Sequence, residues 1–142
     1  KIAWVIGACM LLPKAVYQDI DGFDEAFFLY GEDADLCLRV RKHGYRIDYL
    51  EDISVVHIGG ASEKHAASYD KTMRKQKALH HFYGQHYSKQ DATYLVLREM
   101  RRAKWRMFIY RLAGVFSKNK KARYGHYRAV YDSSKTFLGA MN

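Results

Sequence analysis

The sequence predicts a small α/β unit followed by a mainly helical, basic region. In residues 1–62, short apolar runs typical of buried strands surround one amphipathic helix, whereas residues 63–142 contain no proline and follow helical periodicity. The charge changes at the same boundary. Residues 1–62 carry six Lys/Arg against ten Asp/Glu (net −4), and residues 63–142 carry eighteen against five (net +13). We therefore expect the chemistry in the first part and an anionic partner for the second.

The composition limits the class of protein. With 142 residues, of which 49% are hydrophobic, the chain can bury a core and is not expected to be disordered. Its longest apolar run, Ala3–Leu12, is about half as long as a membrane span requires. No signal peptide is visible, and the chain opens directly onto a strand-like run, so we expect the true N-terminus to lie elsewhere. Two cysteines, Cys9 and Cys37, favour a reducing compartment.

The first unit should contain three strands and two helices. The run Trp4–Leu12 predicts a buried strand in which Gly7 is a bulge or a close backbone approach. The other expected elements are a short helix from Pro13 to about Asp19, a turn at Asp21-Gly22, a helix over Glu32–His43, and strands over Tyr45–Leu50 and Ile53–Ile58.

The helix expected over Glu32–His43 has the clearest signals. Acidic residues occupy its first turn, basic residues its last, and Gly44 follows at the C′ position. Leu36 and Val40 lie four residues apart and should share its buried face. Three carboxylates at the start of one helix, after the aromatic run Phe27–Tyr30, suggest a site for general-base chemistry.

The second unit should be helical throughout. Gly59, Gly60, Ala61 and Ser62 predict a flexible connector, and Ser62 can cap the following helix. The expected elements are helices from about Lys64 to Tyr87 and from about Asp91 to Phe116, a turn at Lys118–Lys121, and a helix near Ala122–Tyr131.

Five motifs occur in order along the first part of the chain. They are Trp4-x-x-Gly7-Ala8-Cys9-Met10, Gly22-Phe23-Asp24-Glu25, Phe28-x-Tyr30-x-Glu32-Asp33-x-Asp35-Leu36-Cys37-x-Arg39, Gly44-Tyr45 and Val56-His57-x-Gly59-Gly60-x-Ser62. Together they closely resemble bacterial family-2 glycosyltransferases, with the rhamnosyltransferase-type enzymes of cell-surface polysaccharide synthesis as the nearest subgroup. The resemblance covers about residues 2–87. It implies a GT-A fold, a nucleotide-sugar donor, a glycan or lipid-linked acceptor, and a divalent metal ion (Mg²⁺ or Mn²⁺).

The resemblance also exposes a missing half. The family carries a nucleotide-binding βαβ half, ending in an Asp-x-Asp metal motif, upstream of the Trp-x-x-Gly strand, and this sequence contains no such half. Its one similar string, Asp33-Ala34-Asp35, belongs to the acceptor-side motif. We therefore expect the C-terminal, acceptor-side portion of an inverting glycosyltransferase.

The resemblance assigns catalysis to the first turn of the Glu32–His43 helix. Asp33 matches the general base that takes the proton of the acceptor hydroxyl, and Glu32 would orient neighbouring groups. Spacing alone favours a plainer interpretation, in which the three carboxylates cap the helix and interact with its dipole. For Asp35 both interpretations, cap or acceptor contact, stay open.

Other residues would complete the site. By the resemblance, His57 lies near the metal-bound diphosphate as a metal ligand, and Gly59, Gly60 and Ser62 form a loop over the donor phosphates. A strand-end histidine and a simple linker are the alternatives. Among the aromatic residues, Trp4 and Tyr30 are expected to contact the acceptor sugar and Phe28 to lie in the core, although all three could be core residues. The six other histidines are expected to be surface or packing residues, because adjacent residues such as His80 and His81 diverge on a helix.

The basic region raises a separate question. Aromatic and basic residues are interleaved, the latter being Arg98, Arg101, Arg102, Lys104, Arg106 and Arg111. This mixture suits an anionic membrane surface, and a lipid-linked acceptor would make a cytoplasmic enzyme at the inner face of the membrane useful. A solvated basic face with a homo-oligomer contact is the alternative. The alternative function for the chain is a non-catalytic basic helical module that binds nucleic acid, an anionic membrane or a partner subunit. Nucleic acid is disfavoured as the partner, since no nucleic-acid motif is present and residues 1–62 are net acidic.

Overall fold

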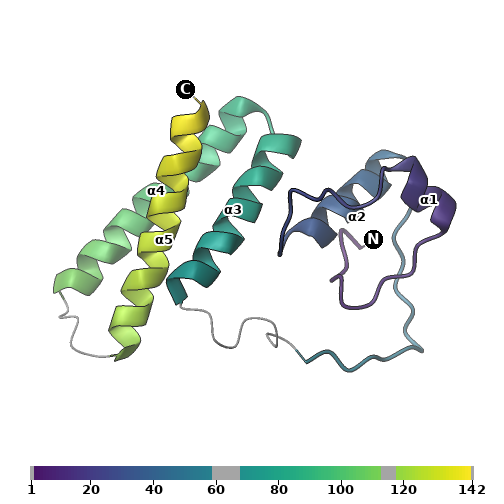
Figure 1. Ribbon diagram of the computed structural model, residues 1–142, viewed down its shortest axis with the longest axis horizontal. Coiled ribbons are helices and arrows are strands. Elements are labelled where there is room, and N and C mark those ends of the chain that lie inside the picture. Colours follow the sequence, from purple (N-terminus) through teal and green to yellow (C-terminus); the bar gives the residue numbers. More distant parts are fainter. Residues whose placement is uncertain (1, 59–67, 113–117, 142) are drawn as a thin grey trace. The chain divides into compact units, whose positions relative to one another are not determined.

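The computed structural model describes residues 2–58, 68–112 and 118–141. Within these ranges it contains five helices and no strand (Figure 1). The chain divides into two compact units, Lys1–Ser62 and Glu63–Asn142. The first unit holds two short helices joined by irregular segments, and the second is a bundle of three long helices.

The helices of the first unit form where the sequence predicts them. α1 (Lys14–Asp19) begins after Pro13, whose carbonyl accepts a hydrogen bond from the Tyr17 N–H at 3.0 Å. α2 (Glu32–Lys42) ends at His43, and Gly44 follows with φ +85°. This is the left-handed C′ glycine that the sequence predicts.

A small core holds α2 in place. Ile20, Leu36 and Val40 are buried together, and the partly buried side chains of Met10, Leu12 and Ile47 pack against them. The predicted shared face of Leu36 and Val40 is confirmed. Because this core joins the segment before α1, the end of α1 and the segment after α2, it fixes the path of the chain around the start of α2.

The three predicted strands, Trp4–Leu12, Tyr45–Leu50 and Ile53–Ile58, are absent. These residues are described, and their backbone is irregular or extended without ladder pairing. A strand exists only when a second strand satisfies its N–H and C=O groups, and the apolar pattern does not supply that partner. Apart from side chains such as Met10, Leu12 and Ile47, which pack against the small core, most of the apolar side chains stay exposed, as at Val56, which is 95% exposed. The predicted α/β class is therefore not confirmed.

The predicted turn at Asp21-Gly22 is confirmed and is tightly packed. Both residues have φ +64°. A Cβ atom at Gly22 would lie 2.8 Å from the Tyr17 ring, because the ring covers this position. The Tyr17 hydroxyl oxygen accepts a hydrogen bond from the Phe23 N–H at 3.3 Å, and the two rings meet edge to face.

We expect Gly22→Ala to destabilise the first unit more than Gly44→Ala does. Both replacements force an L-residue into left-handed backbone, which costs about 1–2 kcal/mol. Only at Gly22 must the Tyr17 ring also move, since nothing lies within 4 Å of a Cβ built at Gly44. Urea unfolding followed by Trp4 fluorescence in a Trp105→Phe background measures the difference. Equal losses for the two variants would show that the Tyr17 contact contributes nothing.

The second unit is a three-helix bundle of α3 (Ser68–His86), α4 (Lys89–Leu112) and α5 (Lys118–Met141), in which α5 packs along both other helices (Figure 1). Small side chains, which allow helices to approach closely, line its interior. The most deeply buried are Ala92, Val96 and Ala103 of α4 and Ala129, Ser133 and Ser134 of α5. Ser88 caps α4, with its Oγ accepting a hydrogen bond from the Asp91 N–H at 3.1 Å.

The predicted helices of the second unit are confirmed with shifted ends, and the predicted turn at Lys118–Lys121 is wrong. α5 begins at Lys118 and continues to Met141, well beyond Tyr131. The four residues Lys-Asn-Lys-Lys contain no glycine or proline, and lysine favours helices, so polarity alone did not justify a turn. Residues 64–67 and 113–116, which were also expected to be helical, lie outside the described residues.

Candidate functional site

The first turn of α2 follows a strained backbone. Tyr30 and Gly31 have φ +72° and +86°, so two successive residues adopt the left-handed conformation. This conformation is rare for a bulky residue such as tyrosine and clusters at functional sites. The resulting turn places Glu32 and Asp33 in the first two positions of the helix.

The Asp33 carboxylate is held at both oxygens. Oδ2 accepts a hydrogen bond from the Gly7 N–H at 3.1 Å, and Oδ1 accepts one from the Ala34 N–H at 2.7 Å. Gly7 therefore lies against the start of α2, and the predicted close backbone approach is confirmed. Each carboxylate oxygen has two lone pairs, so this half-buried group can still accept a further hydrogen bond or a proton.

The segment before α1 runs beside α2. The Cys37 Sγ lies 4.0 Å from the Val5 carbonyl oxygen, and the Arg41 Nη1 donates to the Ala3 carbonyl at 3.5 Å. Burial raises the pKa of the Cys37 thiol, with smaller influences from the Val5 hydrogen bond and the Asp33 charge. The protonated thiol is a packing group here, because a cysteine nucleophile needs its thiolate.

Asp35 has a different environment from Asp33. Its side chain is completely buried, and its Oδ2 accepts hydrogen bonds from Arg39 Nε at 2.8 Å and from Arg39 Nη2 at 2.7 Å. The same guanidinium donates from Nη1 to the Ile20 carbonyl at the end of α1. These contacts link α2 to α1 and favour a structural role over contact with an acceptor. The pairing of Asp35 with Arg39 was not predicted from the sequence, although their spacing of four residues is a signal for such an ion pair on a helix.

Glu32 lies next to Asp33 but is held less firmly. Its side chain is half-buried, and within the part of the chain that the structure describes its Oε2 is buried without a hydrogen-bond partner. A buried carboxylate oxygen without a donor is costly. A hydrogen-bond donor from another molecule or from another segment of the protein would therefore bind favourably to this oxygen.

The three aromatic residues that were considered for the site differ in how exposed their side chains are. Trp4 is half-exposed and lies three residues before Gly7, and Tyr30 is half-buried and lies three residues before Asp33. The prediction that Phe28 is a core residue is wrong, because its side chain is 86% exposed. Phe27 is buried in its place, so the sequence analysis chose the wrong member of an aromatic pair.

Of the predicted metal and donor residues, the structure describes His57 alone. His57 lies in the exposed irregular segment after α2, and Gly59, Gly60 and Ser62 lie outside the described residues. Across residues 2–58, 68–112 and 118–141, no group of three or more His, Cys, Asp or Glu side chains could hold a metal ion. The described residues therefore do not by themselves fit a divalent metal site, and metal dependence stays a prediction.

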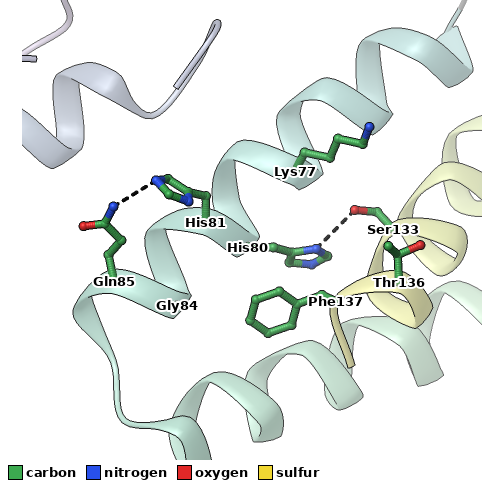
Figure 2. Close-up of a pocket in the computed structure, with 8 residues that line it drawn as sticks. All are labelled: Lys77, His80, His81, Gly84, Gln85, Ser133, Thr136 and Phe137. Carbon is green, nitrogen blue, oxygen red and sulfur yellow. Dashed lines mark hydrogen bonds between the residues drawn. The ribbon is translucent and has the colours of Figure 1, made fainter. Parts of the chain in front are cut away.

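A hollow lies in the helical bundle between α3 and α5 (Figure 2). His80 is buried there, its Nδ1 hydrogen-bonded to the Ser133 Oγ at 3.1 Å and its ring 5.0 Å from that of Phe137. His81 also lines the hollow, but its ring accepts a hydrogen bond from the Gln85 side chain at 2.9 Å. The two adjacent histidines diverge as expected, and their partners make them packing and surface residues.

Comparison with known proteins identifies the family of the chain. The sequence model of the family described as "Glycosyltransferase like family 2" matches residues 1–78, which is more than half of the chain. This match includes both helices of the first unit and all of the candidate site residues. The chain belongs to this family.

Among curated proteins, rhamnosyltransferases are similar to the chain. An N-acetylglucosaminyl-diphospho-decaprenol L-rhamnosyltransferase of Mycobacterium tuberculosis is 29% identical over 105 residues, covering 74% of this chain and 29% of the relative. The rhamnosyltransferase WbbL of Escherichia coli is 36% identical over 56 residues, covering 39% of this chain and 21% of the relative. The chain thus spans less than a third of the length of these relatives. No solved structure matches it.

Proposed function

We propose that this chain is the acceptor-side part of an inverting glycosyltransferase. It would act in glycan synthesis, moving a sugar from a nucleotide-sugar donor to a glycan or lipid-linked acceptor. The observation that carries the proposal is the Asp33 carboxylate at the start of α2, fixed by the Gly7 and Ala34 amides. Membership of family 2 and similarity to rhamnosyltransferases support it.

Asp33 would act as the general base. In an inverting transfer, the acceptor oxygen forms a bond to the anomeric carbon while the bond from that carbon to the nucleotide diphosphate breaks on the opposite face. The acceptor hydroxyl gives its proton to the Asp33 carboxylate in this step. Two amide donors fix the orientation of the carboxylate, which reduces the cost of placing it against the hydroxyl.

The neighbouring side chains would support the base in different ways. Glu32 can accept a hydrogen bond from the acceptor or from another part of the protein, because its buried Oε2 has no donor among the described residues. Trp4 and Tyr30 would contact the acceptor sugar from the segments that precede Gly7 and Asp33. Asp35 would position the site indirectly by holding Arg39 and the end of α1.

The donor side would need residues beyond those described. We place His57, Gly59, Gly60 and Ser62 beside the donor diphosphate, where a divalent metal ion would neutralise charge on the leaving group. The exposed apolar side chains of residues 53–58 could be covered by a sheet in a longer protein. The relatives, at more than three times the aligned length, leave room for such a sheet and for a nucleotide-binding half.

A binding experiment tests whether the donor side of the site needs residues beyond this chain. We expect the 142-residue chain to bind a nucleoside diphosphate only weakly, with a dissociation constant above about 1 mM, because in our proposal the nucleotide-binding half lies outside these residues. A longer protein that includes a nucleotide-binding half should bind it in the micromolar range and transfer the sugar. Isothermal titration calorimetry on both proteins measures this. Tight binding by the 142-residue chain would show that these residues already contain the nucleotide-binding site, which contradicts the proposal.

A further inference from the structure

α4 has two faces, and only one of them is used inside the bundle. Ala92, Val96 and Ala103 are buried against the bundle, and the partly buried Glu99 lies on the same side. On the opposite side, residues recur at alternating spacings of four and three, which keeps them on one helix face. These residues, here called the outer face of α4, are Tyr94, Arg98, Arg101, Trp105, Phe108 and Leu112.

The outer face combines exposed aromatic and apolar groups with positive charge. Trp105 is 62% exposed and Leu112 is 72% exposed, and the Trp105 and Phe108 rings stack with centroids 6.0 Å apart. Arg98 and Arg101 are exposed between Tyr94 and Trp105. Exposed large apolar side chains arranged in one stripe mark an interaction surface.

The distribution of charge indicates what covers this surface. The acidic residues of α4 are Asp91, which bonds to the capping Ser88, and Glu99, which faces His80 on the opposite side of the helix. The outer face is therefore purely cationic. Further exposed basic residues flank it, namely Arg102, Lys104, Arg106 and Arg111. The complementary partner is an anionic surface that also accepts apolar groups.

We propose that the outer face of α4 binds the surface of an anionic lipid membrane. Tyrosine and tryptophan settle at the level of the lipid headgroups, and Phe108 and Leu112 would reach the acyl boundary below them. The arginines would contact the lipid phosphates. The helix would lie in the plane of the membrane, and no helix in the described part of the chain is long and apolar enough to cross a bilayer. This proposal does not depend on the proposed glycosyl transfer.

Vesicle binding of the full chain tests the proposal. In a Trp4→Phe background Trp105 is the single indole. With vesicles of 30% phosphatidylglycerol in phosphatidylcholine, its emission should shift to the blue and be quenched by brominated acyl chains, whereas phosphatidylcholine vesicles alone should have little effect. Binding should weaken as salt is raised, because lipid phosphates and arginines are screened.

Matched variants separate the two components of binding. Arg98→Gln/Arg101→Gln should weaken sedimentation with the anionic vesicles by about thirtyfold, from two surface contacts of about 1 kcal/mol each. Lys121→Gln/Lys135→Gln removes the same charge from exposed positions on α5 and should have a much smaller effect. Trp105→Ala should weaken binding about tenfold, whereas Tyr49→Ala, an exposed aromatic residue of the first unit, should not.

Four results would overturn the proposal. They are Trp105 emission that is already blue-shifted without vesicles, equal effects of the α4 and α5 charge pairs, dimers that Trp105→Ala dissociates, and tight binding to duplex DNA without binding to the anionic vesicles. An early blue shift would place another part of the chain on this face, and equal effects of the two charge pairs would show a general charge effect. Dimers that Trp105→Ala dissociates would assign the face to a second copy, and DNA binding without vesicle binding would assign it to nucleic acid.

Discussion

Asp33→Asn should lower the turnover number of the longer transferase by a factor of about 10² to 10⁴, the usual contribution of a general base. The amide is close in size to the carboxylate, and its single oxygen can still accept one of the two backbone hydrogen bonds, from the Gly7 N–H or from the Ala34 N–H. Folding and donor binding should therefore change little while proton transfer is lost. Transfer of radiolabelled sugar, combined with calorimetry of donor binding, measures the two effects separately.

The control for this prediction is Asp52→Asn. Asp52 is an exposed carboxylate of the same unit, in the turn after α2, and it lies outside the candidate site. It should keep normal turnover. Near-normal turnover of Asp33→Asn would contradict the assignment of the base, and equal losses in the two variants would point to a general effect of charge on the unit.

Asp35→Ala should lower the free energy of unfolding of the first unit by about 3 kcal/mol, because it leaves the mostly buried Arg39 guanidinium without its carboxylate. The double variant Asp35→Leu/Arg39→Met removes both charges and should be considerably more stable than Asp35→Ala. Urea unfolding followed by Trp4 fluorescence in a Trp105→Phe background measures both. A single variant as stable as the parent would show that this ion pair does not hold α2 to α1.

The contrast between Asp33 and Asp35 shows what the sequence could predict. The helix, its glycine C′ position and the shared face of Leu36 and Val40 follow from local patterns, because capping and periodicity act within a few residues. The burial of Asp35 depends on Arg39 reaching the Ile20 carbonyl, a contact between segments nineteen residues apart. Only the Asp35–Arg39 spacing gave a local signal for it.

The errors have a similar cause. The strands predicted for Trp4–Leu12, Tyr45–Leu50 and Ile53–Ile58 have suitable side chains, but whether they form depends on partners that no local pattern reveals. Phe27 and Phe28 are equally apolar, and only the direction in which the irregular backbone turns decides which one is buried. The close approach of Gly7 was predictable because glycine in an apolar run often marks such a contact.

The exposed segment Ile53–Ile58 has a consequence for the behaviour of the protein in solution. Ile53, Val55, Val56 and Ile58 are all exposed, and no Asp, Glu, Lys, Arg or Pro lies between them. Among the described residues, no backbone hydrogen bond outside the helices involves this segment. Such a segment is a template for edge-to-edge pairing with another chain. The chain should therefore be prone to self-association, and a strand from a second polypeptide that paired with this segment would suppress that association.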